Sequence, residues 1–280
     1  MKIAVCIKQV PTREWQPRLD ESKCWIREQD ASFEMNEPDA YALEESLRLR
    51  EAHGGEVVVC SAGPARVAQV LREALARGGD RAIHVEDGRL AAADAFTIAG
   101  VLADAMRDEA FDLVLTGLQS DDLGSAQTGV VLAERLGLPH ATIIMEVNVG
   151  AGVPNAGPMR GSRAWDPNAA PALGWSHGDL RVKRELEGGW FQWINLKLPA
   201  LLTIQSGINQ LRYATLKGIM ASKEKEIRSV TPSAMPEPRV RIAKLDVPRK
   251  TKHTQMIAGS PAEAAKELLR KLREDARVLS

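Results

Sequence analysis

The sequence predicts an α/β protein with a doubly wound, mostly parallel open sheet of the adenine-nucleotide-binding type. Short apolar runs without alternation, such as residues 3–7, are typical of strands buried on both faces. Segments with helical spacing of apolar residues separate these runs, and Gly or Pro ends most of them. Strands that alternate with helices of this length pair in parallel through right-handed crossovers.

The predicted elements alternate along the first half of the chain. Strands are expected over 3–7, 56–60, 81–85, 112–116 and 141–147, and helices over 39–53, 65–77, 91–107 and 125–136. The pairs Gly54-Gly55 and Gly78-Gly79 and the single Gly137 supply C-terminal stops for three of these helices.

The second half of the chain has a different composition. Residues 150–179 read as a long loop insertion rich in Gly, Pro, Ala and Asn, and a hairpin (180–187 and 190–198), a strand (200–204) and a Pro-rich extended stretch (231–252) follow. Ser260 and Pro261 then begin a helix that runs to about residue 276. We therefore divide the chain into an α/β domain, residues 1–228, and an extended C-terminal arm with a helix, residues 229–280.

Composition excludes several classes of function. Thirty-seven basic residues balance thirty-seven acidic ones, so no net field attracts the chain to nucleic acid or to an anionic membrane. No apolar run approaches the roughly 18 residues of a membrane-spanning helix, and the N-terminus lacks the apolar region of a signal peptide. Three dispersed cysteines and five histidines without ligand spacing argue against disulfides and metal binding. We expect a cytoplasmic protein without nucleic-acid binding or membrane insertion.

A ligand of a doubly wound sheet binds at the carboxyl ends of the central strands. The segment that follows the fourth strand is the most informative, because Gly124 and Gly129 bracket small polar residues where a helix is expected to begin. Unpaired amides and the helix dipole favour a phosphate there, and the Ser125 and Thr128 hydroxyls can add donors. The alternative is that Ser125 only caps the helix. Lys8, at the end of the first strand, is either a phosphate partner or a solvated residue.

Motifs of the common nucleotide-dependent enzymes are absent from the sequence. There is no GxxxxGK[ST], no GxGxxG after the first strand and no GxSxG, and no nucleophile lies beside an evident base. The residues therefore predict that the domain 1–228 binds a nucleotide and carries no catalytic residue.

Several motifs resemble the beta subunit of electron-transfer flavoproteins. They are residues 8–11 (KQVP), 35–39 (MNEPD), 61–64 (SAGP), 117–119 (GLQ), 126–129 (AQTG), 196–200 (LKLPA), 212–216 (RYATL) and 219–220 (IM). These motifs follow the family order from residue 1 to about residue 228, whereas the C-terminal part matches in general character only.

The resemblance implies a heterodimer with an alpha subunit that carries electrons from flavin dehydrogenases to a quinone oxidoreductase or a similar acceptor. In the family the alpha subunit holds most of the redox FAD. The beta subunit binds a structural AMP, or a second FAD in electron-bifurcating members. Placement of a flavin, rather than acid–base groups, then explains the missing catalytic residues.

The cofactor-binding residues expected from the resemblance and from the strand ends form one set. They are Cys6, Lys8, Asn36, Glu37, Pro38, Asp39, Ala62, Gly63, Leu123, Gly124, Ser125, Ala126, Gln127, Thr128 and Gly129. The run Gln127-Thr128-Gly129 is similar to that of members that bind AMP.

The family's partner-recognition loop corresponds to residues 212–223. Its expected residues are Arg212, Tyr213, Leu216, Lys217 and Met220, with Leu216 as the exposed apolar anchor. The alternative is that Leu216 is buried. Lys217 replaces a proline common in the family, and Glu residues dilute the lysine run of residues 223–226, so the choice of dehydrogenase stays open. The arm, residues 229–280, is expected to contact the alpha subunit.

Three functions remain open. The first is an AMP-binding subunit of an electron carrier, and the second is a bifurcating subunit whose second FAD accepts hydride from NADH. The third is a free-standing adenine-nucleotide-binding protein of the stress-protein type. The hairpin and the segment 212–220 argue against the third function, because a bare sensor domain has no use for them.

Overall fold

The computed structural model describes residues 1–150, 179–247, 254–275 and 278. It divides into two compact units, Met1–Leu245 and Asp246–Ser280, which are treated separately below. The predicted insertion 150–179 lies outside the described residues except for its two end residues.

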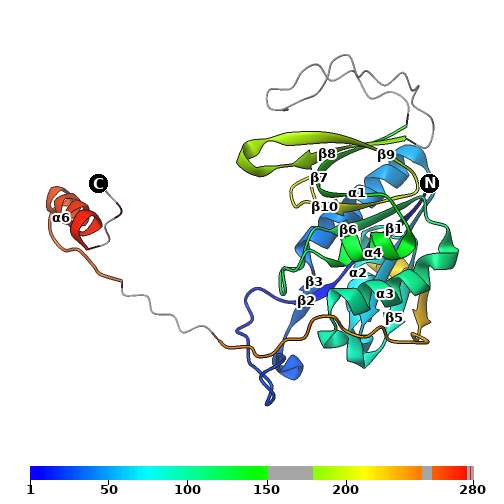
Figure 1. Cartoon of the computed structure of the whole chain (residues 1–280), viewed down its shortest axis with the longest axis horizontal. Helices are drawn as coiled ribbons and strands as arrows, with labels where there is room; N and C mark the ends of the chain where they lie inside the picture. Colours follow the sequence, from blue (N-terminus) through cyan, green and yellow to red (C-terminus); the bar gives the residue numbers. More distant parts are fainter. Residues whose placement is uncertain (151–178, 248–253, 276–277, 279–280) are drawn as a thin grey trace. The chain divides into compact units, whose positions relative to one another are not determined.

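A mostly parallel open sheet forms the centre of the first unit (Figure 1). Within the described residues its nine strands follow the order β11-β5-β4-β1-β6-β10-β7-β8-β9. Their bounds are β1 Lys2–Cys6, β4 Glu56–Gly63, β5 Arg81–Glu86, β6 Leu113–Gly117, β7 His140–Val149, β8 Asp179–Glu185, β9 Phe191–Lys197, β10 Ala200–Ile204 and β11 Ile227–Val230. In this sheet β8 pairs antiparallel with both β7 and β9, and the other described strand pairs are parallel. The predicted doubly wound α/β class and the hairpin are confirmed.

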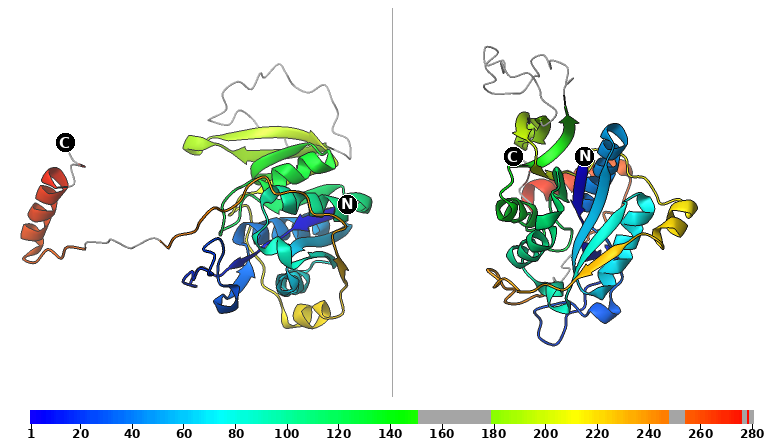
Figure 2. Two further views of the ribbon diagram at one scale, coloured as in Figure 1. Left: turned by 60° about the horizontal axis from the view of Figure 1, so that its bottom comes forward. Right: turned by 90° about the vertical axis from the view of Figure 1, so that its right-hand side faces the viewer.

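Helices cover both faces of the sheet (Figure 2). The helices that pack on the sheet are α1 Glu37–His53, α2 Ala68–Arg77, α3 Ala95–Met106 and α4 Thr128–Leu136. In β1, Ile3 and Val5 join the apolar cluster of α1 and α2, whereas Ala4 and Cys6 join the cluster of α3 and α4. Both faces of this strand are buried, which is why its sequence shows no alternation of apolar and polar residues.

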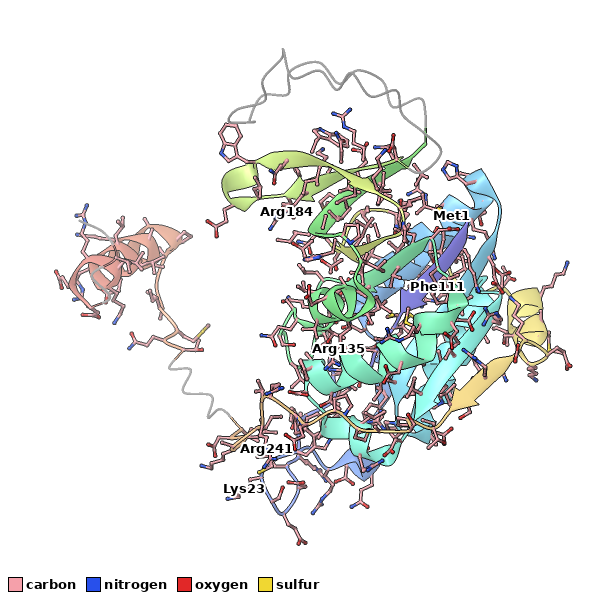
Figure 3. All side chains as sticks on the ribbon, turned by 45° about the vertical axis from the view of Figure 1, so that its right-hand side comes forward. Met1, Lys23, Phe111, Arg135, Arg184 and Arg241 are labelled. Carbon is pink, nitrogen blue, oxygen red and sulfur yellow. The ribbon has the colours of Figure 1, made fainter. Side chains whose placement is uncertain are left out.

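Charged side chains close the amino-terminal edge of the sheet. The Glu109 carboxylate lies 2.6 Å from Arg81 Nη2 and 2.8 Å from both Lys2 Nζ and Arg228 Nη2. The hydrogen bond from Arg81 is the largest cause that lowers the pKa of Glu109 to about 2. Phe111 lies at the same edge, where Lys2 Nζ is 5.2 Å from its ring centroid (Figure 3). This network leaves the opposite, carboxyl-terminal edge of the sheet for a ligand.

Some predicted boundaries were wrong. The helix predicted from Ser125 begins at Thr128, because Gly124 and Ala126 have φ angles of 60° and 54°, which a right-handed helix does not contain. The helix predicted from residue 91 begins at Ala95, after a 3₁₀ turn over Gly88–Ala92. The sequence analysis missed the edge strand β11 and an antiparallel pair, β2 (Gln9–Pro11) with β3 (Phe33–Met35).

The extended stretch that follows β11 lies along the first unit as far as Leu245. The Asp94 carboxylate, which also accepts from the Thr97 amide at the start of α3, accepts from the amides of Arg239 at 2.6 Å and Val240 at 3.0 Å. Residues 229–245, which the sequence places in the arm, therefore belong to the same compact unit as the sheet.

The second unit contains α6, Pro261–Glu274. Ser260 and Glu263 form a capping box, as the predicted helix start requires. Leu268 and Leu269 are about half exposed on this helix. None of the helices in the described part of the chain is long and apolar enough to cross a bilayer.

The buried Asp39 carboxylate links three elements of the first unit. It accepts hydrogen bonds of 2.8 Å from the amides of Lys8, after β1, and Gly117, at the end of β6. A Cβ atom on Gly117 would lie only 2.8 Å from the Asp39 amide nitrogen, so glycine permits this close approach of β6 to α1. Burial raises the pKa of Asp39 from 3.8 to about 7, against the opposing effect of the bonds from Lys8, Asn36 and Gly117.

The raised pKa of Asp39 predicts a pH dependence of stability. The folded chain holds the Asp39 proton more tightly than the unfolded chain, so this group's stabilisation is complete below about pH 4 and is lost as the pH rises through about 7. The loss is on the order of 4 kcal/mol at 1.36 kcal/mol per pK unit. Urea unfolding of the purified protein across this range measures it, and Asp39→Asn is expected to remove this part of the pH dependence.

Asp104→Asn is the matched control, because the Asp104 side chain is 64% exposed. It is expected to leave the slope of unfolding free energy against pH unchanged. An Asp39→Asn protein with the same slope as the unsubstituted protein would contradict the role assigned to this carboxylate, whatever its absolute stability.

Candidate functional site

A cavity of about 120 Å³ lies at the carboxyl ends of β1, β4 and β6. The start of α1, the start of α3 and the loop between β6 and α4 close it. The residues that line it are Cys6, Ile7, Lys8, Gln9, Asn36, Asp39, Ala62, Gly63, Pro64, Arg66, Val67, Leu90, Ala91, Ala93, Ala95, Ile98, Leu102, Thr116, Gly117, Leu118, Gln119, Ser120, Leu123, Ser125, Ala126, Gln127, Thr128 and Gly129. This is the edge at which a doubly wound sheet binds ligands.

The cavity has an apolar part and a polar part. Leu90, Ile98 and Leu102, together with Ala62 at the end of β4, supply apolar surface. Lys8, Asn36, Asp39 and the loop 118–128 supply hydrogen-bonding groups. Such a division suits a ligand with a flat apolar ring joined to a charged polar group.

Asn36 fixes the first part of the loop. Its side-chain amide donates to the Gln119 carbonyl at 3.0 Å, and its Oδ1 accepts from the Asp121 amide at 2.9 Å. The Gly124 amide donates to the Ser120 carbonyl at 2.8 Å, which closes a turn before the helix. The Gly124 amide is therefore used within the loop.

Unlike the Gly124 amide, the next five amides, in the loop and the first turn of α4, are not used within the loop. Among the described residues, the amides of Ser125, Ala126, Gln127, Thr128 and Gly129 have no hydrogen-bond acceptor. Gln127 precedes the helix in a right-handed conformation directly after the left-handed Ala126, and such a change of hand points successive amides to one side. Amides in this arrangement, with the positive end of a helix dipole, attract an anion.

The structure brings twelve of the fifteen predicted cofactor-binding residues to the cavity lining, and three lie beside it. Glu37 faces outward in an ion pair with Arg13, and Pro38 is buried in the first turn of α1. Gly124 contributes its left-handed backbone to the turn that precedes the unpaired amides. Ser125 does not cap α4, since Gln127 holds the cap position without a side-chain hydrogen bond.

Residue-level reasoning missed the apolar part of the cavity and one of its cations. Leu90 follows β5 in the 3₁₀ turn Gly88–Ala92, and Ile98 lies on α3. Arg66 follows the turn at the end of β4. The available signal was position, because Arg66 follows the carboxyl end of β4, and Leu90 and Ile98 follow the carboxyl end of β5, its neighbour in the sheet.

Apolar side chains are exposed around α5, Leu216–Ser222. Tyr213 is 88% exposed, Leu216 78%, Met220 58% and Ile219 45%. These four residues are called the apolar surface below. Lys217 is exposed beside them.

Polar contacts hold α5 in place. Arg72 Nη1 donates to the Ser222 carbonyl at 2.5 Å, and Lys225 Nζ donates to the Gly79 carbonyl at 2.6 Å. Arg212, which precedes α5 in the chain, is bound to α1, where its guanidinium lies 2.8 Å from Glu44 and 2.6 Å from Glu51. The apolar surface is thus fixed by groups that do not belong to it.

The described residues contain no cluster of three or more His, Cys, Asp or Glu side chains that could hold a metal ion.

Comparisons with known proteins agree with one another. The family model "Electron transfer flavoprotein domain" matches residues 23–235. The electron transfer flavoprotein subunit beta of Methylophilus methylotrophus is 32% identical, with 98% of each chain covered. The proteins of the same name from Bacillus subtilis and Homo sapiens are each 31% identical and are covered over 100% and 99% of both chains. With a family model that matches most of the chain and relatives that match its full length, this chain belongs to the electron transfer flavoprotein family, among its beta subunits.

Proposed function

We propose that this chain is the beta subunit of a heterodimeric electron transfer flavoprotein and that its cavity binds AMP. In this proposal the heterodimer carries electrons from flavin dehydrogenases to a quinone oxidoreductase or a similar acceptor, and FAD held mainly by the alpha subunit would supply the redox chemistry. The single observation that carries the AMP assignment is the row of five amides without acceptors, Ser125–Gly129, at the polar part of the cavity.

The residues present fit a nucleoside monophosphate. The apolar part of the cavity, formed by Leu90, Ile98 and Leu102, suits a planar base, and the amides of residues 125–129 suit one phosphate. AMP supplies no redox chemistry, so its contribution in this proposal is structural. By filling the cavity, it joins the loop 118–128 to the starts of α1 and α3.

The apolar surface is the proposed recognition site for the dehydrogenase. Four neighbouring apolar side chains in contact with water stabilise a complex when a partner covers them. The second unit, with Leu268 and Leu269 on α6, and the arm that leads to it are proposed to contact the alpha subunit. We place the assembled protein in the cytoplasm.

Ser125→Glu is the direct test of the amides. Ser125 is exposed, and an acidic residue near the start of α4 favours the helix, so the fold is expected to persist. The new carboxylate competes with the phosphate for the amides, and the AMP content is expected to fall by at least about tenfold. Nucleotide released by denaturing the purified heterodimer is quantified by chromatography.

The unsubstituted heterodimer is expected to release one AMP and one FAD. Ser233→Glu, which adds the same charge at an exposed position outside the cavity lining, is the control and should release the same amounts. Unchanged AMP in Ser125→Glu would refute the phosphate assignment. Two FAD and no AMP would replace the proposal with the bifurcating alternative.

Leu216→Ala tests the apolar surface. Because the side chain is 78% exposed, its removal is expected to change the free energy of unfolding by less than about 0.5 kcal/mol. The rate of electron delivery from the dehydrogenase that the heterodimer captures from native extract should fall several-fold, through a raised KM. The flavin content should not change.

Val240→Ala, at another exposed apolar position of the first unit, is the control for this substitution. Equal kinetics in the Leu216→Ala and Val240→Ala proteins would show that the apolar surface does not bind the dehydrogenase. A lower unfolding free energy in Leu216→Ala would instead assign Leu216 to the core.

A further inference from the structure

Among the described residues that line the cavity, Lys8 and Arg66 carry the positive charges. Lys8 already has an anionic partner, because its Nζ lies 2.6 Å and 2.8 Å from the two carboxylate oxygens of Asp122 and 3.2 Å from Ser120 Oγ. The Lys8 side chain is 39% exposed and that of Asp122 is 18% exposed, and both carboxylate oxygens stay within hydrogen-bond distance of the ammonium group. Lys8 therefore adds little net positive charge to the cavity.

Arg66 is paired as fully as Lys8. Its Nη2 and Nε lie 2.9 Å and 3.2 Å from the two Glu28 oxygens, a bidentate arrangement, and its Nη1 donates to Gln9 Oε1 at 2.6 Å. The guanidinium also lies 3.8 Å from the ring centroid of Phe33. These contacts fix the Arg66 side chain and occupy three of its nitrogen atoms.

The balance of charge around the cavity therefore contains no excess of positive charge. The two cations of the cavity lining face the carboxylates of Asp122 and Glu28, so the charges of these two pairs offset each other. The donors that remain for a ligand are uncharged: the backbone amides of residues 125–129 and the side chains of Ser125, Gln127 and Thr128. Neutral donors at a helix start stabilise one phosphate group, but a second phosphate would add negative charge to a cavity whose two cations are already paired.

We propose that Asp122 and Glu28 are specificity-determining residues: by neutralising Lys8 and Arg66 they make the cavity accept a nucleoside monophosphate and reject a nucleoside diphosphate. This inference rests on the proposed AMP site and adds the reason for its selectivity. The same charge balance disfavours any dinucleotide, whose two phosphates share one bridging oxygen.

The test compares AMP and ADP as ligands of the heterodimer after its nucleotide has been removed. Calorimetric titration gives the ratio of the two dissociation constants. The unsubstituted protein is expected to bind AMP at least about tenfold more tightly than ADP. Asp122→Asn frees Lys8 and Glu28→Gln frees Arg66, and each is expected to reduce this preference by about tenfold or more, chiefly through tighter binding of ADP.

Asp80→Asn is the matched control. It removes a carboxylate that pairs with Arg50 at 2.9 Å near the amino end of β5, away from the cavity lining, and should leave the preference for AMP unchanged. A preference that persists in both Asp122→Asn and Glu28→Gln, with AMP binding intact, would overturn this inference and leave the proposed function standing. Failure of the unsubstituted protein to bind AMP would overturn the proposed function itself.

Discussion

The hydrogen bonds of the buried Asp39 carboxylate are the constraint on which the rest of the site depends. Through the amides of Lys8 and Gly117, one side chain fixes the ends of β1 and β6 against the start of α1. Asn36, just before α1, holds the loop 118–128. Its side-chain nitrogen donates to the Gln119 carbonyl, and its side-chain oxygen accepts from the Asp121 amide. A single helix start thus defines the floor of the cavity and the position of the loop that closes it.

The same helix also supports the surface proposed for the dehydrogenase. Farther along α1, Glu44 and Glu51 bind the Arg212 guanidinium, and the Tyr41 carbonyl accepts a hydrogen bond from the Asn209 side chain. The segment from Asn209 to Arg212 leads directly to α5 and its exposed apolar side chains. The cavity and the apolar surface therefore share one rigid element, although they use different parts of it. A structural nucleotide that orders the start of α1 would help to keep both in place.

The sequence predicted the strands well, because a strand buried on both faces must be apolar throughout, as in β1 and β4. It also located the polar part of the cavity, since Gly124 and Gly129 indicate a turn before a helix. The start of α4 was not predicted correctly, because alanine at position 126 does not by itself indicate a left-handed backbone. The surrounding loop imposes that conformation. The edge strand β11, with Arg228 and Ser229 exposed, lacks the apolar run that identifies a buried strand.

Contacts between distant segments explain the remaining omissions. Leu90 and Ile98 reach the cavity only because β5 lies beside β4 in the sheet, and the pairs Lys8–Asp122 and Arg66–Glu28 join residues from separate elements. No local pattern encodes such pairs.

The most direct measurement of this account is a crystal structure of the heterodimer as purified. It should show one AMP in the cavity, with phosphate oxygens within hydrogen-bond distance of the amides of residues 125–129 and with Asp122 still bound to Lys8. Amides that instead donate to protein atoms, or a dinucleotide that extends past Asp122, would contradict it.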